Sequence, residues 1–147
     1  GIASGRSILA AQSLGAEGVQ IGTLFALSEE SSAHAAFKEA CVKSDEGDTI
    51  LTLKELAPTR LLKNDFYQQV ATLQARGASA DELRELLGRA RAKRGIFEGD
   101  LAEGELEIGQ VAAQIEQVQP VAQIFNNLIA EYNAARAELL DMNWTNC

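Results

Sequence analysis

The sequence predicts an α/β fold: the last βα units of a TIM (β/α)8 barrel over residues 1–28, then a mostly helical segment over residues 29–147. Two short glycine-bearing turns, at Gly1–Gly5 and at Gly22-Thr23, enclose a helical pattern followed by an apolar run. In such a barrel, the chain runs from the end of one strand through a loop, a helix and the next strand to the following loop, and residues 1–23 show this order. A strand should precede Gly1, and there is no initiator Met, so we expect a C-terminal fragment of a larger enzyme.

The first helix is expected to start after an N-cap at Ser4 and to stop at Gly15. Its apolar positions, Ile8, Leu9, Ala11 and Leu14, recur at roughly helical spacing. The apolar run at residues 18–21 then predicts a strand that ends at the second turn.

Beyond residue 28 nearly every segment has a helical pattern. Ser31 or Ser32 is expected to cap a helix that runs to about Lys43. One face of that helix is apolar and contains Ala33, Ala36, Phe37, Ala40 and Cys41. Residues 49–53 are β-branched and apolar and predict a brief strand, while Pro58 marks a break.

Three further helices are predicted in the second half of the chain. One contains Phe66 and ends at Gly77, and the next starts at Ser79. Pro120 opens the longest helix. Its continuous apolar stripe consists of Val121, Ile124, Phe125, Leu128, Ile129 and Tyr132. We expect this stripe to be buried against the barrel or the preceding helices.

The composition excludes some classes of protein. A net charge of −8 over 147 residues disfavours a nucleic-acid-binding surface. No apolar run approaches the ~20 residues needed to span a bilayer. Cys41 and Cys147 are far apart and are interpreted as free thiols of a reducing compartment, so a cytoplasmic protein is expected.

The two glycine turns suit a phosphate site. A phosphate at the mouth of a barrel is held chiefly by backbone N–H groups, and glycine lets the backbone approach it closely. Gly1 and Gly22-Thr23 would lie side by side at the rim, where Thr23 adds a hydroxyl and Gln20 and Ile21 add backbone groups. The alternative is a pair of ordinary βα turns that bind no ligand.

A resemblance to a known family is found in residues 1–6, Ala10-Ala11, residues 14–23, Phe25, residues 28–34 and residues 99–110. These stretches resemble the nitronate monooxygenase family, formerly called 2-nitropropane dioxygenases. The resemblance implies an FMN-dependent TIM barrel with an added helical segment. It also implies a set of residues around the FMN phosphate: Gly1, Ile2, Ala3, Gln20, Ile21, Gly22 and Thr23.

By resemblance, the full enzyme oxidises an alkyl nitronate with O2 to a carbonyl compound and nitrite. The family's catalytic histidine would lie upstream of Gly1, so no catalytic residue is expected in this chain, which alone would be inactive. The expected partners are the small nitronate substrate, O2, the remainder of the barrel and a possible second copy, with no nucleic acid and no membrane. The family commonly has Arg where this chain has Leu24, and a double glycine of which only Gly1 is present.

Two alternative functions stay open. The flavin-dependent enoyl-acyl-carrier-protein reductases share this fold and much of this motif, and would use NAD(P)H and an enoyl thioester. A helical interaction module without a cofactor belongs to a different class, and its long apolar stripe would bind a partner. Flavin absorbance of the purified protein would exclude the module.

Other residues have polar chemistry but are interpreted mainly as structural. The lone His34 is expected to have a structural or capping role rather than to be a base. The basic residues within 89–94 are expected to form a solvated helix end, and Glu103, Glu105 and Glu107 to be exposed. Cys41 is read as a small core residue. No metal site is expected.

Gln110 with the preceding Gly109 is the better candidate outside the turns. In the resembling family this segment folds back toward the active-site mouth. A contact on the flavin or substrate side is therefore expected for Gln110, with packing as the alternative.

Overall fold

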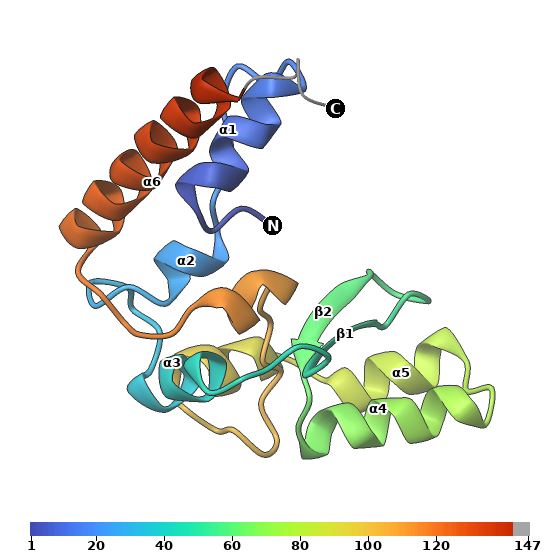
Figure 1. Cartoon of the computed structure of the whole chain (residues 1–147). Helices are drawn as coiled ribbons and strands as arrows, with labels where there is room; N and C mark the ends of the chain where they lie inside the picture. The colour runs from blue at the N-terminus through green and yellow to red at the C-terminus, as the bar shows by residue number, and fades with distance from the viewer. Residues whose placement is uncertain (143–147) are drawn as a thin grey trace.

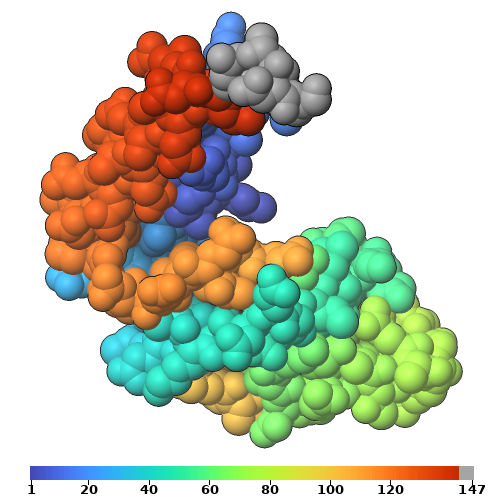
Figure 2. Space-filling view, in the orientation of Figure 1, coloured from blue at the N-terminus to red at the C-terminus, as the bar shows by residue number. Residues whose placement is uncertain are grey.

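The computed structural model describes residues 1–142. Its elements, in chain order, are α1 (Gly5–Ser13), α2 (Thr23–Ala26), α3 (Ala35–Val42), β1 (Thr49–Thr52), β2 (Thr59–Leu62), α4 (Asp65–Ala75), α5 (Ala80–Leu87), η1 (Lys93–Phe97), η2 (Gln110–Gln114) and α6 (Val121–Asp141). The helices α1 and α6 lie side by side at one end of the molecule, although they come from opposite ends of the sequence (Figure 1). The β1–β2 hairpin, α4 and α5 lie at the other end, and the space-filling view shows a concave side between the two ends (Figure 2).

The contact between α1 and α6 depends on a glycine. Gly5 is buried, and a Cβ atom there would overlap backbone atoms of Leu128 and Tyr132. The Gly5 N–H also donates a hydrogen bond to the Glu131 carboxylate at 2.7 Å. Only a residue without a side chain allows this close approach of the two helices.

The hairpin lies between two hydrophobic clusters. Strands β1 and β2 are antiparallel, and the extended segment 106–108 continues the sheet beside β2. Leu62 N–H donates to the Leu106 carbonyl at 2.9 Å, and Ile108 N–H donates to the Arg60 carbonyl at 3.2 Å. The first cluster contains Leu27, Ala33, Phe37, Cys41, Leu62, Leu106, Ile108, Ala112 and Ile115. The second contains Leu53, Leu61, Phe66, Val70 and Leu83. Because successive side chains of a strand alternate between faces, Leu62 and Leu61 contribute to different clusters.

Local helix signals in the sequence are confirmed. The Ser4 hydroxyl caps α1, and Gly15 follows with a φ of 97°. Ser79 and Glu82 form a reciprocal capping box at the start of α5. Pro120 directly precedes α6, and the brief strand predicted at residues 49–53 is β1.

Two local predictions are wrong. No strand forms at residues 18–21, because in residues 1–142 no neighbouring strand hydrogen-bonds to that segment. The cap of α3 is His34 rather than Ser31 or Ser32, since its Nδ1 accepts a hydrogen bond from Ala36 N–H at 3.1 Å. Ser31 Oγ accepts from Ala33 N–H instead and stabilises the preceding turn.

The apolar stripe of α6 is buried only in part, contrary to prediction. Ile124 and Leu128 are buried, but Phe125 is 52% exposed and Ile129 is 58% exposed. A stripe this wide covers more than one face of the helix, and within residues 1–142 the packing of α6 against α1 and α2 buries only part of it. Phe125 contacts Phe25, with ring centroids 5.3 Å apart.

Two predictions of exposure are also wrong. Arg91 is half-buried, stacks over the Phe66 ring at 4.5 Å and donates to the Glu103 carbonyl at 2.8 Å. Glu105 is only 6% exposed, because residues 106–108 pair with β2 and draw it into the fold. Burial is the main cause that raises the pKa of Glu105 to about 7, with a further contribution from the nearby Glu107.

Cys41 is a core residue, as predicted. It is fully buried in the first cluster, and this burial raises the pKa of its thiol to about 12. Cys147 lies outside the described residues. Within residues 1–142, none of the helices is both long and apolar enough to cross a membrane.

Candidate phosphate site and family membership

A cavity of about 420 Å³ opens at the predicted turn Gly22-Thr23. The turn cavity, as we call it, is lined by Gly22, Thr23, Ala26, Pro58, Thr59, Arg60, Glu107, Ile108 and Gly109. It therefore joins the start of α2 to the β-hairpin and to the segment before η2, which are far apart in the sequence. A Cβ atom at Gly22 would meet no other atom within 4 Å, so the space beside this backbone is open to a ligand.

The two predicted turns meet at the same segment. The Thr23 Oγ1 accepts a hydrogen bond from the Gly109 N–H at 3.1 Å. A Cβ atom at Gly1 would lie 3.0 Å from a side-chain methyl carbon of Val111. Residues 109–111 thus contact both turns. Because Thr23 uses a lone pair in this bond, its hydroxyl proton remains able to donate to an anion.

Gln110 lies next to these contacts but does not itself make the hydrogen bond. It is exposed and is the first residue of η2, whose N-cap is Gly109. The expected return of this segment to the predicted site is therefore seen at Gly109 and Val111, the neighbours of Gln110. A contact of Gln110 with flavin or substrate stays a prediction.

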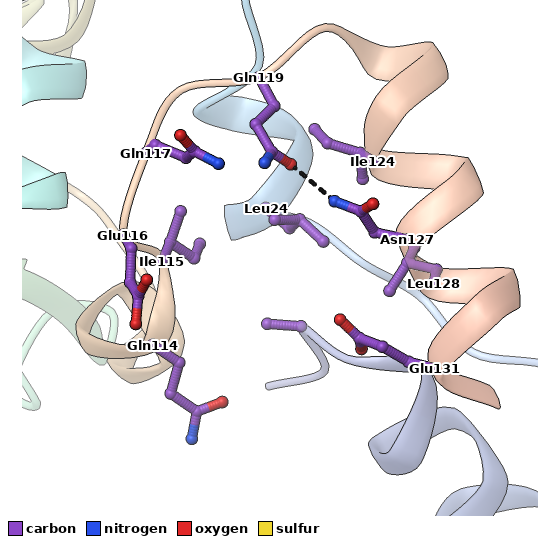
Figure 3. Close-up of a pocket in the computed structure, with 11 residues that line it drawn as sticks. Leu24, Gln114, Ile115, Glu116, Gln117, Gln119, Ile124, Asn127, Leu128 and Glu131 are labelled. Carbon is purple, nitrogen blue, oxygen red and sulfur yellow. Dashed lines mark hydrogen bonds between the residues drawn. The ribbon is translucent and has the colours of Figure 1, made fainter. Parts of the chain in front are cut away.

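The remaining predicted residues divide between different surroundings. Ala3 lines a second cavity of about 260 Å³ (Figure 3). Glu116, from the segment after η2, and Glu131, from α6, line opposite sides of this cavity (Figure 3). Two carboxylates without a cation among the lining residues repel a phosphate, so this cavity is unsuited to one.

Ile21 faces neither of these cavities. It lines an apolar groove between α1, α2 and α6. The groove is formed by Ile8, Val19, Ile21, Phe25, Phe125, Leu128, Ile129 and Tyr132. Gln20 is exposed and Ile2 is half-buried, and a role of their backbone groups in binding phosphate stays a prediction.

Sequence reasoning missed the contribution of the hairpin to the turn cavity. Pro58, Thr59 and Arg60 all line it, whereas Pro58 was interpreted only as a break. The signal was the pair of apolar segments on either side of Pro58, which form β1 and β2. Their arrangement next to α2 depends on the first hydrophobic cluster and is not encoded by any local motif.

His34 has the structural role predicted for it. The imidazole of His34 caps α3 and lies against Gly99, and the backbone N–H of His34 donates a hydrogen bond to the Ile96 carbonyl at 2.7 Å. It is not among the residues that line the turn cavity. In the described part of the chain, no group of three or more His, Cys, Asp or Glu side chains is arranged to hold a metal ion.

Comparison with known proteins identifies the family. The family model described as nitronate monooxygenase matches residues 1–131, which include both turns and the segment 109–111. The chain belongs to the nitronate monooxygenase family. Members of this family are oxidoreductases.

Curated relatives match shorter stretches. A probable nitronate monooxygenase of Staphylococcus haemolyticus is 54% identical over 52 residues, which is 35% of this chain and 15% of that protein. One of Staphylococcus saprophyticus is 42% identical over 71 residues, which is 48% of this chain and 20% of that protein. The matches thus span a fifth or less of the length of these relatives.

Solved structures match nearly the whole chain. FabK from Thermotoga maritima is 34% identical with a TM-score of 0.85, covering 95% of this chain and 44% of FabK. Nitroalkane oxidase from Streptomyces ansochromogenes is 28% identical with a TM-score of 0.74, covering 94% of this chain and 39% of that enzyme. The chain therefore corresponds in fold to a part of each of these structures, and this part is less than half of either one.

Proposed function

We propose that this chain forms the phosphate-binding part of an FMN-dependent nitronate monooxygenase. The full-length protein would oxidise alkyl nitronates with O2 to a carbonyl compound and nitrite. The observation that carries the proposal is the meeting of the Gly1 turn and the Gly22-Thr23 turn at residues 109–111. Family membership supports the class of reaction.

The residues of the turn cavity fit a phosphate group. The open space beside Gly22 lets an anion approach the backbone of the turn closely. The Thr23 hydroxyl, held by Gly109, adds an oriented donor. Bound FMN would supply the redox chemistry, and these residues would fix its position.

The catalytic base is proposed to lie outside this chain, at a residue that precedes Gly1 in the full-length protein. His34 caps α3 through its Nδ1, and the Glu105 side chain is buried, so we propose neither of them as the catalytic base. The chain's own contribution is binding and orientation.

The apolar groove supports a further part of this proposal. Phe125 and Ile129 of α6 expose large apolar surfaces beside Ile8, Val19 and Ile21. We infer that strands of the barrel cover this groove in the full-length protein, which fits the extent of FabK outside the matched part. Residues 1–28 would then complete the barrel, and residues 29–147 would form the added segment.

The test is to purify the full-length protein, identify its flavin and compare two assays. O2 uptake and nitrite release with an alkyl nitronate are the expected activities. NADPH or NADH oxidation with an enoyl thioester is the outcome for the alternative that the sequence left open, a flavin-dependent enoyl-acyl-carrier-protein reductase. A full-length protein that binds no flavin would contradict both enzyme functions and would favour the helical interaction module instead.

A further inference from the structure

The predicted phosphate turn has no cation of its own. Residues 18–27 contain neither Lys nor Arg. The one basic residue before them is Arg6. It forms an ion pair with Glu138 of α6, with 2.5 Å between its guanidinium nitrogen and the carboxylate oxygen. A phosphate monoester carries a charge of about −1.5 to −2 at neutral pH, and the net charge of this chain is −8. A dianion at this turn therefore requires a cation from elsewhere in the fold.

Arg60 is connected to the turn through two consecutive residues. Its carbonyl accepts the hydrogen bond from Ile108 N–H at 3.2 Å, and the next residue, Gly109, donates to Thr23 Oγ1 at 3.1 Å. The position of β2 relative to α2 is thereby set by backbone hydrogen bonds. Arg60 lines the same cavity as Gly22 and Thr23.

The pleat of β2 directs Arg60 to the α2 side of the sheet. Residues two apart share a face, so Arg60 shares its face with Leu62, which packs in the same cluster as Leu27 just after α2. Glu107 is the other charged residue of the cavity. It pairs with Leu61 of β2, and within residues 1–142 its carboxylate forms no ion pair with Arg60.

The guanidinium of Arg60 is held in place without being neutralised. Its NH1 donates to the Thr49 carbonyl at 3.1 Å and to the Thr49 Oγ1 at 3.3 Å. Within residues 1–142 no carboxylate forms an ion pair with it. Since a guanidinium has five N–H donors in a planar fork, the others can bind an anion while Thr49 fixes the orientation.

We propose that Arg60 is the side-chain cation of the flavin phosphate site, supplied by the hairpin to the Gly22-Thr23 turn. This inference rests on the proposed function, since it takes the anion to be the phosphate of FMN. It assigns to β1 and β2 a role in cofactor binding that no sequence motif indicates.

The experiment compares FMN with riboflavin, which lacks the phosphate, as ligands of the apo form of the full-length protein. Binding is followed by quenching of flavin fluorescence in the wild type, Arg60→Gln, Arg60→Lys and the control Arg76→Gln. Arg76 is exposed, pairs with Glu82 and does not line the turn cavity. Arg76→Gln therefore removes one positive charge from the protein, as Arg60→Gln does, without changing the cavity. We expect Arg60→Gln to weaken FMN binding about 10- to 100-fold, the usual range for charge-assisted hydrogen bonds. Riboflavin binding should stay within about twofold of the wild type.

Arg60→Lys should retain part of the FMN affinity, and Arg76→Gln all of it. Equal weakening of FMN and riboflavin by Arg60→Gln would show a structural role only and overturn the proposal. So would wild-type FMN affinity in Arg60→Gln. In both cases FMN binding by the wild type would leave the proposed function standing, whereas a wild type that binds no flavin would remove the proposed function itself.

Discussion

Thr23 and Gly109, which are 86 positions apart in the sequence, are joined by a hydrogen bond from the Gly109 N–H to the Thr23 Oγ1 at 3.1 Å. The bond connects the start of α2 to the segment that enters η2. It satisfies a half-buried backbone donor and at the same time orients the hydroxyl that faces the turn cavity.

Replacing Thr23 by Val tests this bond, because the two side chains have nearly the same shape. Thr23→Val leaves the Gly109 N–H without its acceptor and should lower the free energy of unfolding by about 1–2 kcal/mol. It should also weaken FMN binding, since the hydroxyl donor is lost. Chemical denaturation and flavin titration measure the two effects. Thr23→Ser, which keeps the hydroxyl, should behave like the wild type, and equal loss in both variants would contradict this role of the bond.

Gly22→Val separates the effect on the ligand from an effect on the fold. A Cβ atom at Gly22 would meet no atom of the chain, and the backbone φ of −99° is accessible to any residue. The melting temperature of the apoprotein should therefore stay within about 2 °C of the wild type, since surface substitutions usually change stability by about 0.5 kcal/mol or less. The side chain would enter the space proposed for the phosphate, so FMN affinity should fall tens- to hundreds-fold, or ~2–4 kcal/mol. If FMN affinity remains at the wild-type level, the phosphate does not bind at this turn.

Much of the helical structure could be predicted because its signals are local. A capping residue such as Ser79 acts on backbone groups within one helical turn, and Pro120 restricts only its neighbours. The strand expected at residues 18–21 depends on neighbouring strands instead, and no periodicity of the segment itself can supply these. The predicted caps were confirmed for α1 and α5, where the signal lies next to the helix.

The candidate site could be predicted only in its two turns. Gly22 and Thr23 stand in a recognisable pattern, whereas Arg60 enters the same cavity through the pairing of β2 with residues 106–108. The burial of Glu105 has the same origin. In the sequence, Glu105 is two residues from both Glu103 and Glu107, a pattern that resembles an exposed acidic stretch. Contacts between segments some 40 residues apart in the sequence cannot be read from composition or spacing.

Gly5→Ala tests the crossing of α1 and α6. The added methyl group would overlap backbone atoms of Leu128 and Tyr132, which cannot rotate away as a side chain would. We expect the helices to separate and the free energy of unfolding to fall by about 1–3 kcal/mol, the usual cost of overpacking. The control is Gly18→Ala, where a Cβ atom would meet nothing within 4 Å. Similar melting temperatures for the two variants would mean that the helices do not pack this closely.

His34→Ala tests the assignment of the lone histidine. The substitution removes the acceptor of the Ala36 N–H and should cost about 1 kcal/mol of stability, as the loss of a helix cap does. Turnover of the full-length protein should stay within a few-fold, because a general base contributes ~100-fold or more. His34→Asn offers an alternative capping side chain and should recover most of the stability. A loss of turnover of 100-fold or more with flavin still bound would instead make His34 a catalytic residue.

The buried Glu105 should make stability depend on pH. Burial raises its pKa in the folded state from the ordinary value of 4.5 to about 7, the adjacent Glu107 adds to this rise, and Arg91 opposes it. Below about pH 4.5 the carboxyl is protonated in both the folded and the unfolded state, so it adds no pH dependence there. Between about pH 4.5 and 7 the unfolded state loses its proton first, and the free energy of unfolding falls by up to about 3 kcal/mol.

Glu105→Gln replaces the carboxyl by a neutral amide of the same shape and should abolish this part of the pH profile. At pH 8 the variant should be more stable than the wild type, whereas at pH 4 the two should be nearly equal. Urea denaturation at a series of pH values measures the difference. Glu107→Gln is the matched control, because Glu107 is exposed and its removal should flatten the profile only slightly. If the profiles of the wild type and Glu105→Gln run parallel from pH 4 to 8, the Glu105 carboxyl is hydrated in solution and its pKa is not raised.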